Sequence, residues 1–178
     1  MREQRINRRS KYLKFARAYL KEHGIQYRFR WGGAWGGGFA TGRRGKNGYI
    51  QINMTVGGDE QGDRVPVTVR TFLSTLFHEV SHIISYRTGK YAVYHHGKLR
   101  LTTPELKELI RTALRAEVYT DSQAEKTMKK HFPDIPFERG YNEWGKKQFR
   151  RYFIAPARED LERRLKRKAR RAKATKRR

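Results

Sequence analysis

The chain has 178 residues, of which 42 are Lys or Arg and 17 are Asp or Glu, giving a formal net charge of +25. This length suits one domain with appendages. Cysteine is absent, so disulfides, cysteine-ligated metal sites and thiol nucleophiles are excluded. No run of about 18 apolar residues occurs, so no membrane-spanning helix is expected. The positive charge favours a polyanionic partner, because neutralised phosphates release their counterions.

The N-terminal sequence MREQRINRRSKYLKF is basic and has no apolar segment typical of a secretory signal. We therefore expect an intracellular, cytoplasmic protein, and one associated with nucleic acid. An amphipathic helix is predicted next, with Ser10 as its N-cap and Gly24 as its stop, because apolar residues recur between them at helical spacing.

The middle of the first half predicts strands. Residues 25–31 (IQYRFRW) alternate at strand period, and residues 48–54 (GYIQINM) form the next predicted strand. The glycine-rich residues 32–48 predict a hairpin or flexible lid around a short strand. Their Gly45-Lys46-Asn47 fails the phosphate-binding pattern that needs Ser or Thr after Gly-Lys, so nucleotide binding is not expected.

Two long helices and a basic tail complete the prediction. The helices are expected at residues 67–86 and 103–131, the second capped by Thr102 or Thr103. Residues 158–178 hold twelve cations against three acids; their composition favours helix, but like charges predict a solvated or frayed segment until a partner binds. We expect a domain over residues 1–156 and a basic tail over 157–178.

The candidate metal-binding and catalytic residues lie in His78-Glu79-Val80-Ser81-His82, which is an H-E-x-x-H pattern on the first of these two helices. Residues four apart lie on one helical face, so both imidazoles can reach one ion. Glu79 is then close enough to orient and deprotonate a bound water. The flanking residues are apolar, and two histidines and a glutamate need a reason to be buried among them.

A catalytic zinc site needs a third protein ligand. The extended pattern with Gly at 85 and His at 88 is excluded by Ser85 and Thr88. Two candidates remain open: Glu117 on the long helix and His96 in the segment before it. Positions 117 and 121 share a helical face, and Asp121 can accept the second N–H of a ligating histidine.

H-E-x-x-H followed by Glu117-x-x-x-Asp121-x-x-Ala124 resembles the minimal gluzincin peptidases, including the ImmA/IrrE-like proteins. The resemblance covers roughly residues 40–130. It implies that Glu117 completes the zinc site, that Asp121 supports His78 or His82, and that Ala124 permits close helix packing. It also implies that residues 48–54 are the edge strand over the active-site helix, where extended substrate pairs.

The His96 alternative resembles the SprT-like proteases, which act on proteins attached to DNA. There a histidine-glycine follows the H-E-x-x-H, here His96-Gly97. The basic charge suits this group, but the chain lacks the cysteines of its usual zinc ribbon.

These observations predict an α+β, zincin-like metallopeptidase: a helix, a small mostly antiparallel sheet, the H-E-x-x-H helix and a long helix with the third ligand. Zn2+, a protein or peptide substrate and nucleic acid are the expected partners. Oxyanion-stabilising candidates are Tyr94, His95, Tyr141 and Tyr152. A non-catalytic, basic nucleic-acid-binding or structural protein of a virus, phage or other mobile element, with a fold-stabilising zinc, is the alternative. The predicted nucleic-acid contacts are Arg163, Arg164, Lys166, Arg167, Lys168, Arg170 and Arg171.

Overall fold

The chain is α+β and divides into two compact units. Met1–Val93 with Tyr119–Arg139 form unit 1, and Tyr94–Val118 with Gly140–Arg178 form unit 2. None of the described helices is long and apolar enough to cross a membrane. A computed structural model describes residues 4–32, 37–41, 48–57, 64–89, 102–140, 146–147 and 149–175.

Helix α1 (Lys11–Glu22) opens unit 1 and confirms the predicted amphipathic helix. The Ser10 hydroxyl accepts a hydrogen bond from the Tyr12 N–H at 3.2 Å, which caps the first turn. The chain leaves the helix at Gly24, whose φ of 60° is a conformation that glycine adopts without strain. The buried face of α1 consists of Leu13, Ala16, Tyr19 and Leu20.

Three strands form a mixed sheet in the order β1-β3-β2. Strand β1 (Gln26–Arg30) runs parallel to β3 (Tyr49–Asn53), and β2 (Gly37–Thr41) runs antiparallel to β3. A separate two-residue ladder pairs β4 (Thr55–Val56) with β5 (Val65–Pro66). The three-stranded sheet is thus mixed, with one parallel and one antiparallel pairing, whereas the sequence predicted a mostly antiparallel sheet.

The expectation that residues 48–54 form an edge strand is wrong. Strand β3 is the central strand, because β1 and β2 pair with its two sides. Its Ile50 and Ile52 are buried in the core. Among the described strands, β2 is at one edge of the sheet and packs against α2, and β1 is at the other edge.

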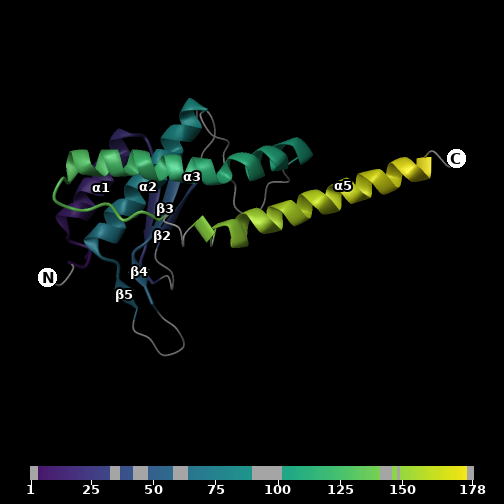
Figure 1. Cartoon of the computed structure of the whole chain (residues 1–178). Helices are drawn as coiled ribbons and strands as arrows, with labels where there is room; N and C mark the ends of the chain where they lie inside the picture. Colours follow the sequence, from purple (N-terminus) through teal and green to yellow (C-terminus); the bar gives the residue numbers. More distant parts are fainter. Residues whose placement is uncertain are drawn as a thin grey trace. The chain divides into compact units, whose positions relative to one another are not determined.

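Helix α2 (Val69–Thr88) is the centre of the core and lies along the sheet (Figure 1). Most of its apolar side chains are buried, including Phe72, Leu76 and Ile83, whereas Ile84 is 42% exposed. The helix begins and ends two residues later than predicted. It is capped by Thr68, whose hydroxyl accepts the Thr71 N–H, and ends at left-handed Gly89.

Helix α3 (Thr103–His131) has the predicted bounds and continues from unit 2 into unit 1. Its cap is Thr102, whose N–H and hydroxyl both donate to the Glu105 carboxylate at 2.7 and 2.8 Å. These two hydrogen bonds lower the pKa of Glu105. Near its other end, α3 contributes Ala124 and Met128 to the core of unit 1.

Unit 2 ends in a long exposed helix. A short π-helical turn, η1 (Arg150–Ile154), leads directly into α5 (Ala155–Thr175). The helix-favouring composition of the basic tail therefore corresponds to a continuous helix. All α5 side chains that the structure describes are exposed or half-buried.

Candidate metal centre

His78 and His82 lie one turn apart on α2, and their imidazoles converge. The two Nε2 atoms are 3.0 Å apart, and the rings meet nearly at right angles. His82 is buried, whereas His78 is half-buried. The four-residue spacing produces this convergence because both side chains leave the same face of the helix.

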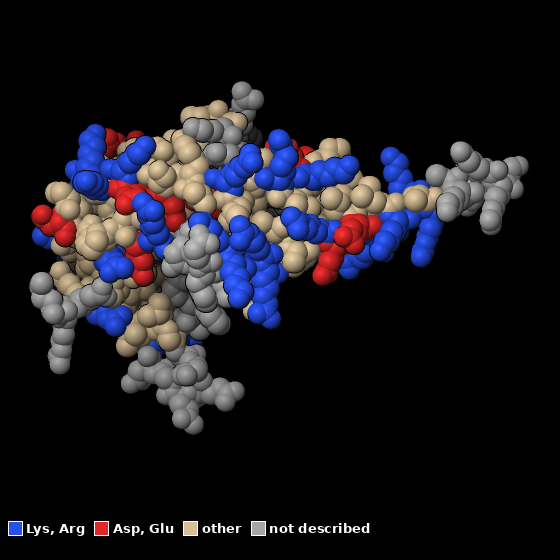
Figure 2. Space-filling view, viewed as in Figure 1, with Lys and Arg blue, Asp and Glu red and all other residues tan. Residues whose placement is uncertain are grey.

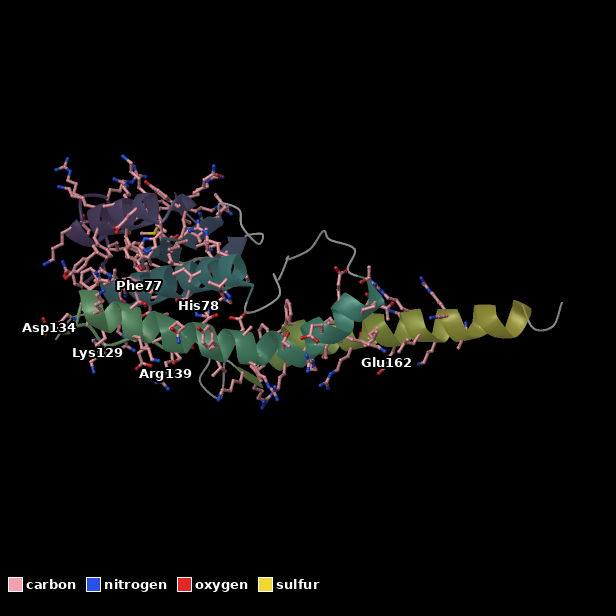
Figure 3. The ribbon with its side chains drawn as sticks, turned by 90° about the horizontal axis from the view of Figure 1, so that it is seen from above. Phe77, His78, Lys129, Asp134, Arg139 and Glu162 are labelled. Carbon is pink, nitrogen blue, oxygen red and sulfur yellow. The ribbon has the colours of Figure 1, made fainter. Side chains whose placement is uncertain are left out.

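Asp121 fixes the orientation of His78. The Nδ1 atom of His78 is 2.7 Å from Asp121 Oδ1, and Asp121 is itself buried. An ionised carboxylate can only accept, so His78 donates this hydrogen bond from Nδ1; in the neutral ring of that tautomer Nε2 carries a lone pair. In Figure 3 the His78 side chain lies between α2 and α3. The sequence left open which histidine Asp121 supports, and the structure selects His78.

His82 has a partner that the sequence did not indicate. Thr120 Oγ1 lies 3.4 Å from His82 Nδ1, and Thr120 is only 1% exposed. The ring of Tyr86, one turn further along α2, stacks on His82 with 5.7 Å between ring centroids. Neighbouring residues of α3, Thr120 and Asp121, therefore each contact the Nδ1 side of one histidine.

This arrangement directs both Nε2 atoms toward the same point. At 3.0 Å one ring can donate an Nε2–H to the Nε2 of the other, and a bound cation would take the place of that proton. Two nitrogens bound to one tetrahedral zinc ion, each at about 2.0–2.1 Å, are about 3.3–3.4 Å apart. The observed separation is close to that value, so the pair fits a shared metal ion with a small adjustment.

Glu117 is the third group at this point. One ligand atom each from His78, His82 and Glu117 can be chosen so that all lie within 4.8 Å of one another. Glu117 is buried and lies one turn before Asp121 on the continuous helix α3. Its placement therefore follows from the same helix that orients His78. Ala124, one turn beyond Asp121, is fully buried in the core, as close packing requires.

We expect Glu117→Gln, but not His96→Ala, to weaken zinc binding strongly. The amide oxygen of glutamine carries no charge and is a weaker ligand for zinc than a carboxylate. Zinc affinity measured by competition with a chromogenic chelator checks both variants. The reverse pattern would exclude Glu117 as a ligand and favour the alternative with His96.

His96 and three of the oxyanion-stabilising candidates, Tyr94, His95 and Tyr141, lie outside the described residues. Tyr152 lies on η1 and is 68% exposed.

Glu79 lies where α2 meets the edge strand β2. It is buried, and a Cβ added to Gly38 on β2 would come within 3.0 Å of the Glu79 Cγ and 2.8 Å of the Gln51 carbonyl oxygen. Only glycine permits this approach of the strand backbone to the helix. Gly38 was not recognised from the sequence, although a glycine within a strand is a known sign of close backbone approach.

The donor set has the composition of a catalytic zinc site. Two imidazole nitrogens and one carboxylate oxygen are borderline-soft and hard ligands that zinc accepts together, and three protein ligands leave a position for water. If these three groups held zinc, the buried Glu79, which directly follows His78 on α2, would be the carboxylate available to act on such a water.

Comparison of the chain with protein-family models, with curated proteins and with solved structures finds no match.

Proposed function

We propose that the protein is a zinc-dependent peptidase with a zincin-like arrangement, in which His78, His82 and Glu117 hold the ion. The observation that supports this most directly is the convergence of two Nε2 atoms at 3.0 Å, with the opposite side of His78 held by Asp121. Glu79, which is buried and directly follows His78 on α2, supplies the carboxylate that hydrolysis needs in addition to the ion.

Each residue has a distinct role in this proposal. When bound, zinc supplies a more acidic water and polarises the scissile carbonyl. Glu79 takes the proton from that water and later gives it to the leaving nitrogen. Asp121 holds the His78 ring so that Nε2 remains a ligand. The burial of Glu79, His82 and Glu117 keeps the site in a low dielectric, where such interactions are stronger.

The edge strand β2 is the proposed position of the substrate. Among the described strands its outer side has no partner, and its Gly38 lies against Glu79. An extended polypeptide that pairs with β2 as an additional strand would pass the catalytic carboxylate. This moves the proposed substrate contact from β3, where the sequence placed it, to β2.

Removal of the metal tests the proposal. We expect the purified protein to hydrolyse an unfolded protein such as reduced casein, and we expect 1,10-phenanthroline to abolish this hydrolysis. Addition of Zn2+ should restore it, because the apo site lacks the group that acidifies water. Fragments are followed by mass spectrometry. Hydrolysis that persists after zinc has been removed would contradict the proposal, and a zinc-loaded protein without hydrolysis would favour the structural zinc alternative.

We further propose that α5 binds nucleic acid through its cationic side. Arg163, Lys166, Arg167 and Arg170 are exposed and lie within about 100° of one another around the helix, opposite Leu161 and Leu165. Figure 2 shows Lys and Arg along α5, with Asp and Glu confined to its first half. Arg164 is paired with Asp160 at 2.7 Å. Lys168 and Arg171 add to the same basic segment.

Replacing Arg163, Lys166, Arg167 and Arg170 together by Gln is expected to lower the salt dependence of duplex DNA binding. Each phosphate contact contributes about 0.9 to the slope of log K against log salt, so the slope should fall by about 3.6. Fluorescence anisotropy at several salt concentrations gives the slope. The matched control replaces four exposed lysines of α3, Lys107, Lys126, Lys129 and Lys130, by Gln. An equal effect of both variants would indicate unspecific charge attraction instead.

A further inference from the structure

A groove lies between α1 and β1, at the edge of the sheet opposite to β2. The groove is shallow and largely open to solvent, so it could hold an extended ligand along the surface but would not enclose one. None of its residues belongs to the candidate metal centre or to α5. The groove is lined by Arg17, Ala18, Lys21, Ile25, Gln26 and Tyr27.

One wall of the groove is positively charged. Lys14, Arg17 and Lys21 lie within about 60° of one another on α1, and the stripe extends over about 10.5 Å of the helix. All three are exposed, and none forms an ion pair in the part of the chain that the structure describes. The single acid of α1, Glu22, is rotated about 100° from Lys21. Figure 3 shows nitrogen-tipped side chains projecting from the outer side of this helix.

The other wall carries an exposed aromatic ring. Tyr27 on β1 is 37% exposed, and its ring lies 5.0 Å from the ring of Phe29. Phe29 in turn meets the fully buried Phe72 edge to face at 5.7 Å. The tyrosine is therefore supported from the core while part of its ring faces the groove. A supported aromatic ring beside a row of cations is the arrangement on which unpaired bases stack.

We propose that this groove binds single-stranded nucleic acid, with a base stacked on Tyr27 and phosphates neutralised by Lys14, Arg17 and Lys21. The cationic stripe runs beyond the groove along α1, which fits a polymer of phosphates and not a single nucleotide. A base within a duplex is already stacked and cannot lie on Tyr27, so the aromatic ring favours unpaired strands. No residue of the groove belongs to the proposed peptidase site. The groove would be a second nucleic-acid-binding surface in addition to α5, and one that distinguishes single strands from duplexes.

Binding of a fluorescent oligothymidylate of about 20 nucleotides to the full-length protein tests the proposal. Tyr27→Ala should weaken binding at least about fivefold, equivalent to about 1 kcal/mol, and Tyr27→Phe should bind like the wild type. An abasic strand of the same length carries the phosphates without bases, so on it Tyr27→Ala should change nothing. The double variant Arg17→Ala/Lys21→Ala should lower the salt slope by about 1.4, at about 0.7 for each cation.

The matched control is Lys129→Ala/Lys130→Ala, which removes two exposed cations from the end of α3. It should leave the affinity ratio between thymidylate and abasic strands unchanged. Equal binding of thymidylate by Tyr27→Ala and the wild type would overturn the proposal, as would a loss of the same size on the abasic strand. An equal loss on duplex DNA would overturn the preference for single strands. These measurements follow binding alone, so a failure of the peptidase proposal does not affect them.

Discussion

Glu79→Gln is expected to lower peptide hydrolysis by about 10²- to 10⁴-fold while zinc content and folding are retained. The amide has the size of the carboxylate but cannot take a proton from water. Since Glu79 is buried beside Gly38, a neutral side chain of equal volume fits the same space with a smaller desolvation cost than the carboxylate. The rate of casein hydrolysis measures activity, mass spectrometry measures zinc content, and thermal unfolding checks that the fold is retained.

Glu125→Gln is the matched control. It removes the same charge one turn beyond Asp121, where Glu125 pairs with Arg139 at 2.6 Å on the protein surface. Its hydrolysis rate should equal that of the wild type, because surface ion pairs contribute little to stability and this pair does not contact the histidines. Wild-type hydrolysis by Glu79→Gln would remove Glu79 from the mechanism.

His78→Ala is expected to abolish zinc binding, from about one ion per chain in the wild type. The variant loses one of the proposed ligands and the hydrogen bond between Asp121 and His78. Asp121→Asn should have an intermediate effect, because loss of such a supporting carboxylate weakens metal affinity by about 10- to 100-fold. Zinc content after dialysis, together with competition by a chelator, ranks the wild type, Asp121→Asn and His78→Ala by zinc affinity.

His23→Ala is the control for this series. The Nδ1–H of His23 donates a hydrogen bond to the Tyr19 carbonyl oxygen at the end of α1, and His23 is far from the site residues in the sequence. Zinc should raise the unfolding temperature of the wild type and of His23→Ala but not of His78→Ala, because only a ligand bound to the folded state stabilises it. Unchanged zinc content in His78→Ala would exclude the proposed metal centre.

Local signals explain why the helices were predicted from the sequence. Ser10 and Gly24 delimit α1, and Thr102 with Glu105 forms a reciprocal cap at the start of α3. Each signal acts within a few residues, so no tertiary information is needed. The spacing of His78 and His82 likewise depends only on the helical repeat.

Features that depend on packing between distant segments were not predictable in this way. Whether Asp121 contacts His78 or His82 depends on how α2 and α3 cross, and Thr120 approaches His82 for the same reason. Strand order is also a long-range property. The alternation in β3 indicates one buried face, but it cannot show that β1 and β2 pair with both of its sides.

The order β1-β3-β2 gives the sheet two edges of different chemistry. Two strand spacings separate them, about 9.6 Å. If both are occupied as proposed, a polypeptide associated with a nucleic-acid strand would be tethered at β1 while its extended segment reaches β2. Tethering raises the effective concentration of that segment well above its concentration in solution. Selectivity for nucleoprotein over free protein would then arise from proximity, without any side chain at the cleavage position being recognised.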